Sequence, residues 1–191
     1  MAVYDDEFNE MLFENIEVAA QDITPKVITG LAIRPAAVLV NANNKGYCRA
    51  ILDRDSQSFF LQNLSSIESA VNRGNVWRIL CDNTVLGLIK GETLLKCAAK
   101  HIVPENEELT LTVIFQQLAW VLKYKMSNDH VKSEVEDLLS NAYALKLAEH
   151  CPSKTMQNLL LTEYLNILGP HKDAELIKDL ERGFKTFRGA T

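Results

Sequence analysis

The chain has 191 residues, of which 47% are hydrophobic and 24% are charged. This balance is typical of a folded globular protein and excludes a disordered one. The net charge of −5 provides no general attraction to nucleic acid or to anionic lipid, although a local basic face is compatible with it.

The N-terminal segment combines acidic side chains with a helical apolar pattern. Residues 6–20 place Phe8, Leu12 and Ile16 on one face, so we expect an amphipathic helix over 5–21. The segment has neither the basic start nor the apolar run of a secretory signal, and it is too acidic for a mitochondrial presequence. Together with widely spaced cysteines and no CxxC motif, this predicts a cytoplasmic or otherwise intracellular protein that is not secreted.

A short helix and an ambiguous stretch come next. Thr24 and Pro25 are typical residues of a helix N-cap and first turn, and Gly30 ends the helix that they predict. In residues 36–52, two apolar runs flank turn-forming residues at 41–46. This pattern fits either a small hairpin or an irregular, exposed loop between two short helices, and we favour the loop.

Three further helices are predicted before the middle of the chain. The first is capped by Asp55 or Ser56 and ends at Gly74. The second begins at Asn75, and the third covers residues 92–103. Each carries apolar side chains at three- and four-residue steps, which is the period of a helix.

The most apolar long stretch is residues 107–126. Its apolar side chains follow the helical period and not the alternation of a strand. Gln116 and Gln117 in its middle would make a membrane span costly, so we predict the central core helix of a globular domain. A second apolar stripe, with Trp120 and Tyr124, lies on another face, and we therefore expect this helix to be sheltered on several sides.

Three more helices complete the prediction. One ends near His150, one is capped by Ser153, and the last covers 172–188. We therefore expect an all-α fold, with about eight helices forming a single compact multi-helix domain over 1–191. A bilobed domain with a boundary near 103–108 is the alternative. No fixed repeat period is present, which argues against a regular solenoid.

The sequence contains no motif for catalysis or for a cofactor. A Gly-rich phosphate loop, HExxH, GxSxG and Glu-x-x-His pairs are all missing. Cys81 next to Asp82 and His150 next to Cys151 are adjacent pairs, but a nucleophile also needs a base that a third group orients. We expect no catalytic residue, no metal site and no cofactor, and hence no enzyme.

The function that the sequence favours is a non-catalytic protein–protein interaction or self-assembly subunit. The terminal helices at 5–21 and 172–188 are candidate partner-docking arms of the helix-in-groove kind. They would bind a protein partner or another copy of the chain, which would make a homo-oligomer. The candidate partner-binding residues are Phe8, Leu12, Phe13, Phe184 and Phe187.

Uneven charge supports an alternative function. All charged residues in 1–25 are acidic, whereas those in 26–54 are mostly basic. A basic cleft of this kind would package single-stranded RNA, as a nucleoprotein or a coat-like viral structural subunit does. The acidic net charge and the lack of a basic run argue against it, and no membrane partner is expected. The candidate RNA-binding residues are Lys45, Tyr47, Arg49, Arg54, Arg73 and Arg78.

Overall fold

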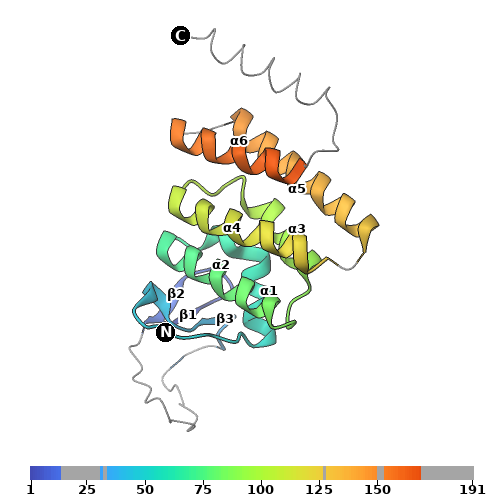
Figure 1. The fold of residues 1–191 in the computed structure, drawn as a ribbon. Coiled ribbons are helices and arrows are strands. Elements are labelled where there is room, and N and C mark those ends of the chain that lie inside the picture. Colours follow the sequence, from blue (N-terminus) through green and yellow to red (C-terminus); the bar gives the residue numbers. More distant parts are fainter. Residues whose placement is uncertain (14–30, 32–33, 127, 150–152, 169–191) are drawn as a thin grey trace.

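The computed structural model describes residues 1–13, 31, 34–126, 128–149 and 153–168. Helices account for 66% of these residues and number six, and they accompany one three-stranded sheet (Figure 1). The predicted helical character is confirmed. The all-α class and the count of about eight helices are only partly matched, because the described residues contain a sheet and fewer helices. The helices predicted at 24–30 and 172–188 lie outside the described residues.

The sheet occupies the place of the first predicted helix. β1 (Ala2–Tyr4) lies between β2 (Glu10–Phe13) and β3 (Ala37–Leu39), and both pairings are antiparallel. All three residues of β1 are buried, so the central strand belongs to the core. The register shifts between Val3 and Tyr4 on the β2 side, which marks a bulge before the β1–β2 turn.

A turn held by Asp5 explains why no helix begins here. The Asp5 carboxylate accepts hydrogen bonds from the backbone N–H groups of Glu7 and Asn9 at 2.9 and 2.8 Å, and Phe8 has a φ of 70°. A short acidic side chain that bonds the nearby backbone in this way competes with helical hydrogen bonds. The predicted helix over 5–21 is therefore wrong for its described part, and the remainder lies outside the described residues.

The first two helices have other boundaries than predicted. α1 (Arg54–Asn63) is capped by Asp53, whose carboxylate accepts from two backbone N–H groups at 3.0 Å. α2 (Ala70–Val85) begins after Ser69, whose hydroxyl accepts from a backbone N–H in the first turn. The predicted end of a helix at Gly74 is wrong, since this residue lies inside α2. A capping serine and tertiary packing outweigh the modest helix penalty of one glycine.

Residues 36–52 form neither a hairpin nor two short helices. Only β3 is a strand, and its partner is β1; a single 3₁₀ turn, Ala42–Asn44, follows it. Residues 47–52 have no regular structure. The predicted hairpin and the two predicted short helices are therefore both wrong. The predicted irregular, exposed loop is confirmed for residues 45–49.

Buried asparagines on α2 hold this irregular segment in place. Asn72 Oδ1 accepts from the backbone N–H of Asn43 at 2.6 Å. The Asn83 amide accepts from the N–H of Leu52 at 3.2 Å and donates to the carbonyl of Ala50 at 2.9 Å. These side-chain amides provide the hydrogen-bond partners that a neighbouring strand would otherwise supply.

The other four helices agree with the predictions. Asn128 and Ser153 act as N-caps, because their side-chain oxygens accept from backbone N–H groups of the first turn. These two caps, and the helical period of the apolar residues in all four helices, are visible in the sequence. The four helices are α3 (Gly91–His101), α4 (Glu108–Tyr124), α5 (Asp129–Glu149) and α6 (Lys154–Leu168).

The helices form a stack in which each packs on the helix two positions further along the chain (Figure 1). α1, α3 and α5 make one rank, and α2, α4 and α6 make the other. The ranks also touch each other through the pairs α3/α4 and α5/α6. Packing of each layer on its nearest neighbours is typical of α-solenoid proteins. In this chain it occurs without a repeat in the sequence.

α4 lies in the middle of this stack and contacts α2, α3 and α6. One of its faces is at most 1% exposed, and the aromatic ring of Phe115 on that face lies 5.1 Å from the ring of Tyr143 on α5. The prediction of a central core helix is therefore confirmed. The fully buried residues of this face are Leu111, Ile114, Phe115, Leu118 and Val121.

The connection between α3 and α4 is bonded to helices on both of its sides. Arg73 on α2 forms an ion pair with the buried Glu105 at 2.7 Å. The buried Lys146 on α5 donates to the carbonyl of Val103 at 2.7 Å. Whether residues 103–108 separate two lobes stays a prediction.

We predict that Gly91→Ala destabilises the protein. Gly91 starts α3 where it meets the end of α4, and a Cβ there would lie 2.8 Å from the Lys125 carbonyl oxygen and 3.2 Å from Val121 Cγ1. The substitution should lower the free energy of unfolding by about 1–3 kcal/mol, the usual cost of overpacking. Urea denaturation measures it.

Gly74→Ala is the matched control. Gly74 is also helical, but a Cβ there meets only Thr110 Oγ1 at 3.5 Å, an ordinary contact. This substitution should raise the free energy of unfolding by roughly 0.5–1 kcal/mol, because alanine loses less backbone entropy on folding. Equal effects of the two substitutions would contradict the close approach of α3 to α4.

Candidate interaction surface

α4 carries a second apolar stripe that the fold leaves in solvent. Trp120 is 37% exposed and Tyr124 is 59% exposed, and their ring centroids are 5.5 Å apart. They lie one turn apart, on the side of α4 opposite its buried face. The expectation that α4 is sheltered on several sides is therefore wrong for this stripe. Exposed aromatic side chains of this size are typical of protein interfaces.

The end of α2 extends the stripe into a larger patch. Three aliphatic side chains there, and in the turn that follows, are between 42% and 51% exposed. The Lys125 Nζ donates to the carbonyl of Val85 at 3.0 Å and lies 5.6 Å from the ring centroid of Trp120, so the two helix ends are neighbours. We name the aromatic patch as Val85, Leu86, Leu88, Trp120 and Tyr124.

Positive charge accompanies the aromatic patch. The Lys123 Nζ lies 5.2 Å from the ring centroid of Tyr124, and Lys125 is similarly placed over Trp120. A cation near the face of an aromatic ring is attracted by the electron density of the ring. The patch therefore combines flat apolar rings with two cations.

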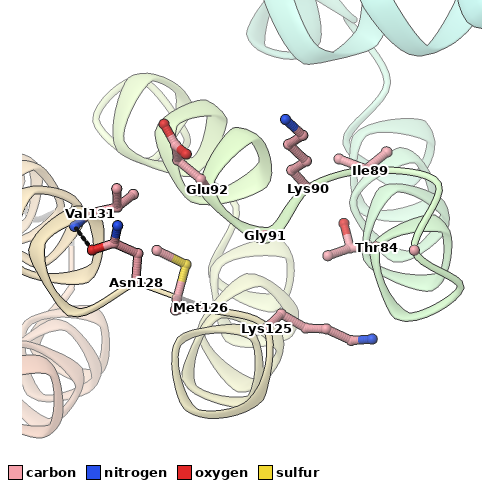
Figure 2. A pocket seen from close by; sticks show the side chains of 10 residues that line it. Thr84, Ile89, Lys90, Gly91, Glu92, Lys125, Met126, Asn128 and Val131 are labelled. Carbon is pink, nitrogen blue, oxygen red and sulfur yellow. Dashed lines mark hydrogen bonds between the residues drawn. The ribbon is translucent and has the colours of Figure 1, made fainter.

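A hollow of about 400 Å³ adjoins the aromatic patch, and Lys125 lines it. Figure 2 shows Gly91, Met126 and Asn128 around this hollow, while the amines of Lys90 and Lys125 point apart. An anion site needs donors that converge on one point. The hollow therefore extends the shape of the surface and does not form a phosphate cradle.

A second hollow, of about 710 Å³, lies between the β1–β2 turn and the start of α2. Its carboxylates are exposed, and its apolar lining is partly or fully buried. Burial and the neighbouring Glu10 raise the pKa of the Tyr4 phenol to about 12, so this phenol stays neutral. We name the acidic hollow as Tyr4, Glu7, Phe8, Glu10, Ile67 and Glu68.

Among the predicted partner-binding residues, Phe8 packs on its own domain. Its ring centroid lies 5.5 Å from that of Phe59, which also stacks on Tyr4 at 6.4 Å. The half-buried Phe8 therefore has a structural contact and, at the same time, forms part of the acidic hollow. Leu12 and Phe13 lie on β2, and Phe184 and Phe187 lie outside the described residues. A role of these five residues in partner binding stays a prediction.

The candidate RNA-binding residues are dispersed over several elements. Arg54 is exposed at the first residue of α1. Arg73 donates to Glu105 at 2.7 Å and is thus engaged inside the fold, and Arg78 donates to Asn44 Oδ1 at 3.3 Å. Lys45, Tyr47 and Arg49 share one exposed loop, and the contact of Arg78 with Asn44 places a fourth of the six candidates beside it.

The aromatic patch is not among the sites that the sequence predicts. Its signal is present in the sequence, since Trp120 and Tyr124 belong to the second apolar stripe of the helix. Periodicity shows that a helix has an apolar face, but it does not show whether another element covers that face. The acidic hollow joins segments far apart in the chain, so only the fold reveals it.

The buried thiols are unsuited to catalysis. Burial raises the pKa of Cys81 to about 12, with a smaller contribution from Asp82, and burial raises the pKa of Cys97 to about 12 as well. Both thiols therefore stay protonated and are poor nucleophiles. Cys151 lies outside the described residues. Within the described ranges, no group of three His, Cys, Asp or Glu side chains is placed to hold a metal ion.

Comparison with protein-family models, with curated proteins and with solved structures finds no match to this chain. Among the helices that the structure describes, none is long and apolar enough to cross a lipid bilayer. The surfaces and contacts of this chain are therefore the basis on which its function is proposed.

His101 is a buried histidine held in one neutral form. Its Nε2 lies 3.2 Å from the carbonyl of Leu61, to which it can only donate, and its Nδ1 accepts from the N–H of Ser65 at 3.3 Å. Burial lowers the pKa of His101, and the nearby Lys100 adds to this effect. The Ser65 hydroxyl lies 2.5 Å from Nδ1 and can donate to it or accept from it, so burial is the main reason why the ring resists a second proton.

We predict that His101 makes the protein less stable as the pH falls through and below about 6.5, the ordinary histidine pKa. The unfolded chain then gains a proton that the folded chain resists, and stability decreases with falling pH. Urea denaturation at pH 7.5 and 5.5, for wild type and His101→Gln, measures this difference. The wild type should lose more stability than the variant over this interval; equal losses would contradict the neutral, buried state of His101.

Proposed function

We propose that this protein is a non-catalytic interaction subunit that self-associates through the aromatic patch. The observation that carries this proposal is the exposed ring pair of Trp120 and Tyr124 beside the aliphatic end of α2. Tryptophan and tyrosine are the side chains that most often dominate the binding energy of an interface. A contiguous apolar patch on the surface of a folded chain is typical of a docking site.

A second copy of this chain is the occupant that charge complementarity favours. The aromatic patch carries Lys123 and Lys125, whereas the acidic hollow carries Glu7, Glu10 and Glu68. Complementary charges raise the association rate and select the partner, and apolar contact supplies most of the affinity. The half-buried ring of Phe8 also lines the hollow and provides an apolar contact for a second copy.

This pairing joins two different surfaces of the same chain. A contact between unlike surfaces is heterologous, and repeated copies then build a ring or an open filament. Since Lys123 and the three carboxylates are exposed and Lys125 is half-buried, added salt screens their attraction and weakens the association. Self-assembly of this kind needs no cofactor and no catalytic group.

We predict that the double substitution Trp120→Ala and Tyr124→Ala weakens self-association by about tenfold or more, since each aromatic anchor of an interface usually contributes over 1 kcal/mol. Light scattering coupled to size-exclusion chromatography, over a wide range of protein concentration, measures the mass. Wild type should show a mass that rises with concentration, and the variant should reach the same mass only at a concentration about tenfold higher or more.

Leu109→Ala is the matched control for this experiment. Leu109 is 75% exposed and lies at the opposite end of the same helix, outside the aromatic patch. The control should associate as wild type does. A wild-type mass equal to one chain at every concentration would refute self-association, and equal behaviour of both variants would refute the role of the patch.

RNA packaging is the alternative, supported by Tyr47, which is fully exposed between Lys45 and Arg49 in one loop. An aromatic ring between two basic side chains suits stacking on a base beside phosphate contacts. The absorbance spectrum of the same purified samples distinguishes RNA packaging from self-assembly. Co-purified nucleic acid, seen as a raised ratio of absorbance at 260 to 280 nm and removed by salt, would favour RNA packaging over self-assembly.

A further inference from the structure

A further hollow, of about 250 Å³, lies between α4, α5 and α6. The α4 side of its lining is apolar, because Phe115, Leu118 and Leu122 recur at steps of three and four on one buried face of that helix. A cavity of about 150 Å³ with a lining of this kind is large enough to bind benzene. The hollow therefore has room for an apolar molecule of about the size of one ring.

Tyr143 on α5 contributes a buried polar group to this lining, and we name the site the Tyr143 hollow. The side chain is fully buried, and its ring lies beside that of Phe115, with 5.1 Å between the ring centroids. Among the residues that the structure describes, the Tyr143 hydroxyl has no hydrogen-bond partner. Buried hydroxyl groups are nearly always hydrogen-bonded. This phenol therefore has a donor to offer to a molecule in the hollow.

The carboxylate of Glu163 on α6 lines the same hollow and is half-buried. Burial raises the pKa of Tyr143 well above its usual value, and the nearby charge of Glu163 raises it further. The phenol thus keeps its proton, and it lies near the carboxylate without bonding to it. A group placed between the two would have to accept from the phenol and donate to the carboxylate. A hydroxyl does both.

The remaining charges of the lining are balanced. Lys123 and Lys132 provide two cations, and Glu136 joins Glu163 to provide two carboxylates. All four side chains are exposed or half-buried, whereas Tyr143 is buried. An ion of either sign would meet a like charge at the rim. The hollow therefore suits a neutral molecule.

We propose that the Tyr143 hollow binds a small neutral alcohol or phenol. The hydroxyl of the ligand would lie between Tyr143 and Glu163, and its apolar part would pack on the α4 side of the lining. A mostly apolar pocket between helices, with a few polar groups that orient the ligand, is typical of a small-molecule site. This binding does not require the proposed self-association, so the two proposals can fail separately.

An NMR titration of the full chain tests the site with two probes of similar shape. Para-cresol carries a hydroxyl on its ring, and toluene is the matched probe without one. Both should shift the amide signals of α4, α5 and α6 around the hollow. Para-cresol should bind about three- to tenfold more tightly than toluene, which is the usual net contribution of one hydrogen bond.

Tyr143→Phe removes only the hydroxyl and keeps the ring. Since this hydroxyl has no partner among the described residues, the variant should be at least as stable as wild type in urea denaturation without a probe. The variant should bind toluene as wild type does and lose the preference for para-cresol. Lower stability of the variant would overturn the proposal, because the hydroxyl would then have a structural partner.

Ala119→Leu is the second variant. Ala119 is an exposed residue of the α4 lining, so a larger side chain there fills the hollow without disturbing the core. It should weaken the binding of both probes several-fold. Unchanged binding would overturn the proposal, since the probes would then occupy another site. Failure of wild type to bind either probe, or equal affinity of wild type and Tyr143→Phe for para-cresol, would overturn it as well.

Discussion

The packing of the buried face of α4 is the interaction on which the rest of this structure depends. Leu111, Phe115 and Leu118 lie on a single face that is almost fully removed from solvent. Burial of apolar area at roughly 25 cal/mol per Å² makes such a face the main source of stability in a small domain. Because α4 contacts α2, α3 and α6, it joins the layers on either side of it into one stack.

The same helix shows why a sequence predicts a core more readily than a surface. Both apolar stripes of α4 follow the helical period, and only the fold determines that one is covered while Trp120 and Tyr124 stay in solvent. The proposed function depends on that difference. An apolar stripe in the core stabilises the fold, whereas one in solvent provides free energy for binding.

The helices after Gly91 were predictable because their signals are local. Caps such as Asn128 act over one turn, and apolar periodicity acts along one segment. Two of the failures involve local signals, the Asp5 turn and the Asp53 cap, whereas the failures over the sheet and residues 47–52 involve partners distant in sequence. β1 pairs with β3, which lies more than thirty residues further along the chain. The side-chain amide of Asn83 forms the hydrogen bonds with the backbone of Ala50 and Leu52 that a neighbouring strand would otherwise form. No local propensity encodes such contacts, so the sheet and the acidic hollow were found only in the structure.

Native-state hydrogen exchange, followed residue by residue, tests the central position of α4 most directly. If the stack depends on this helix, the amides from Leu111 to Leu122 should exchange only through global unfolding and show the highest protection of the described residues. Exchange of these amides through local opening, while those of α1 or α6 stay protected, would contradict the account.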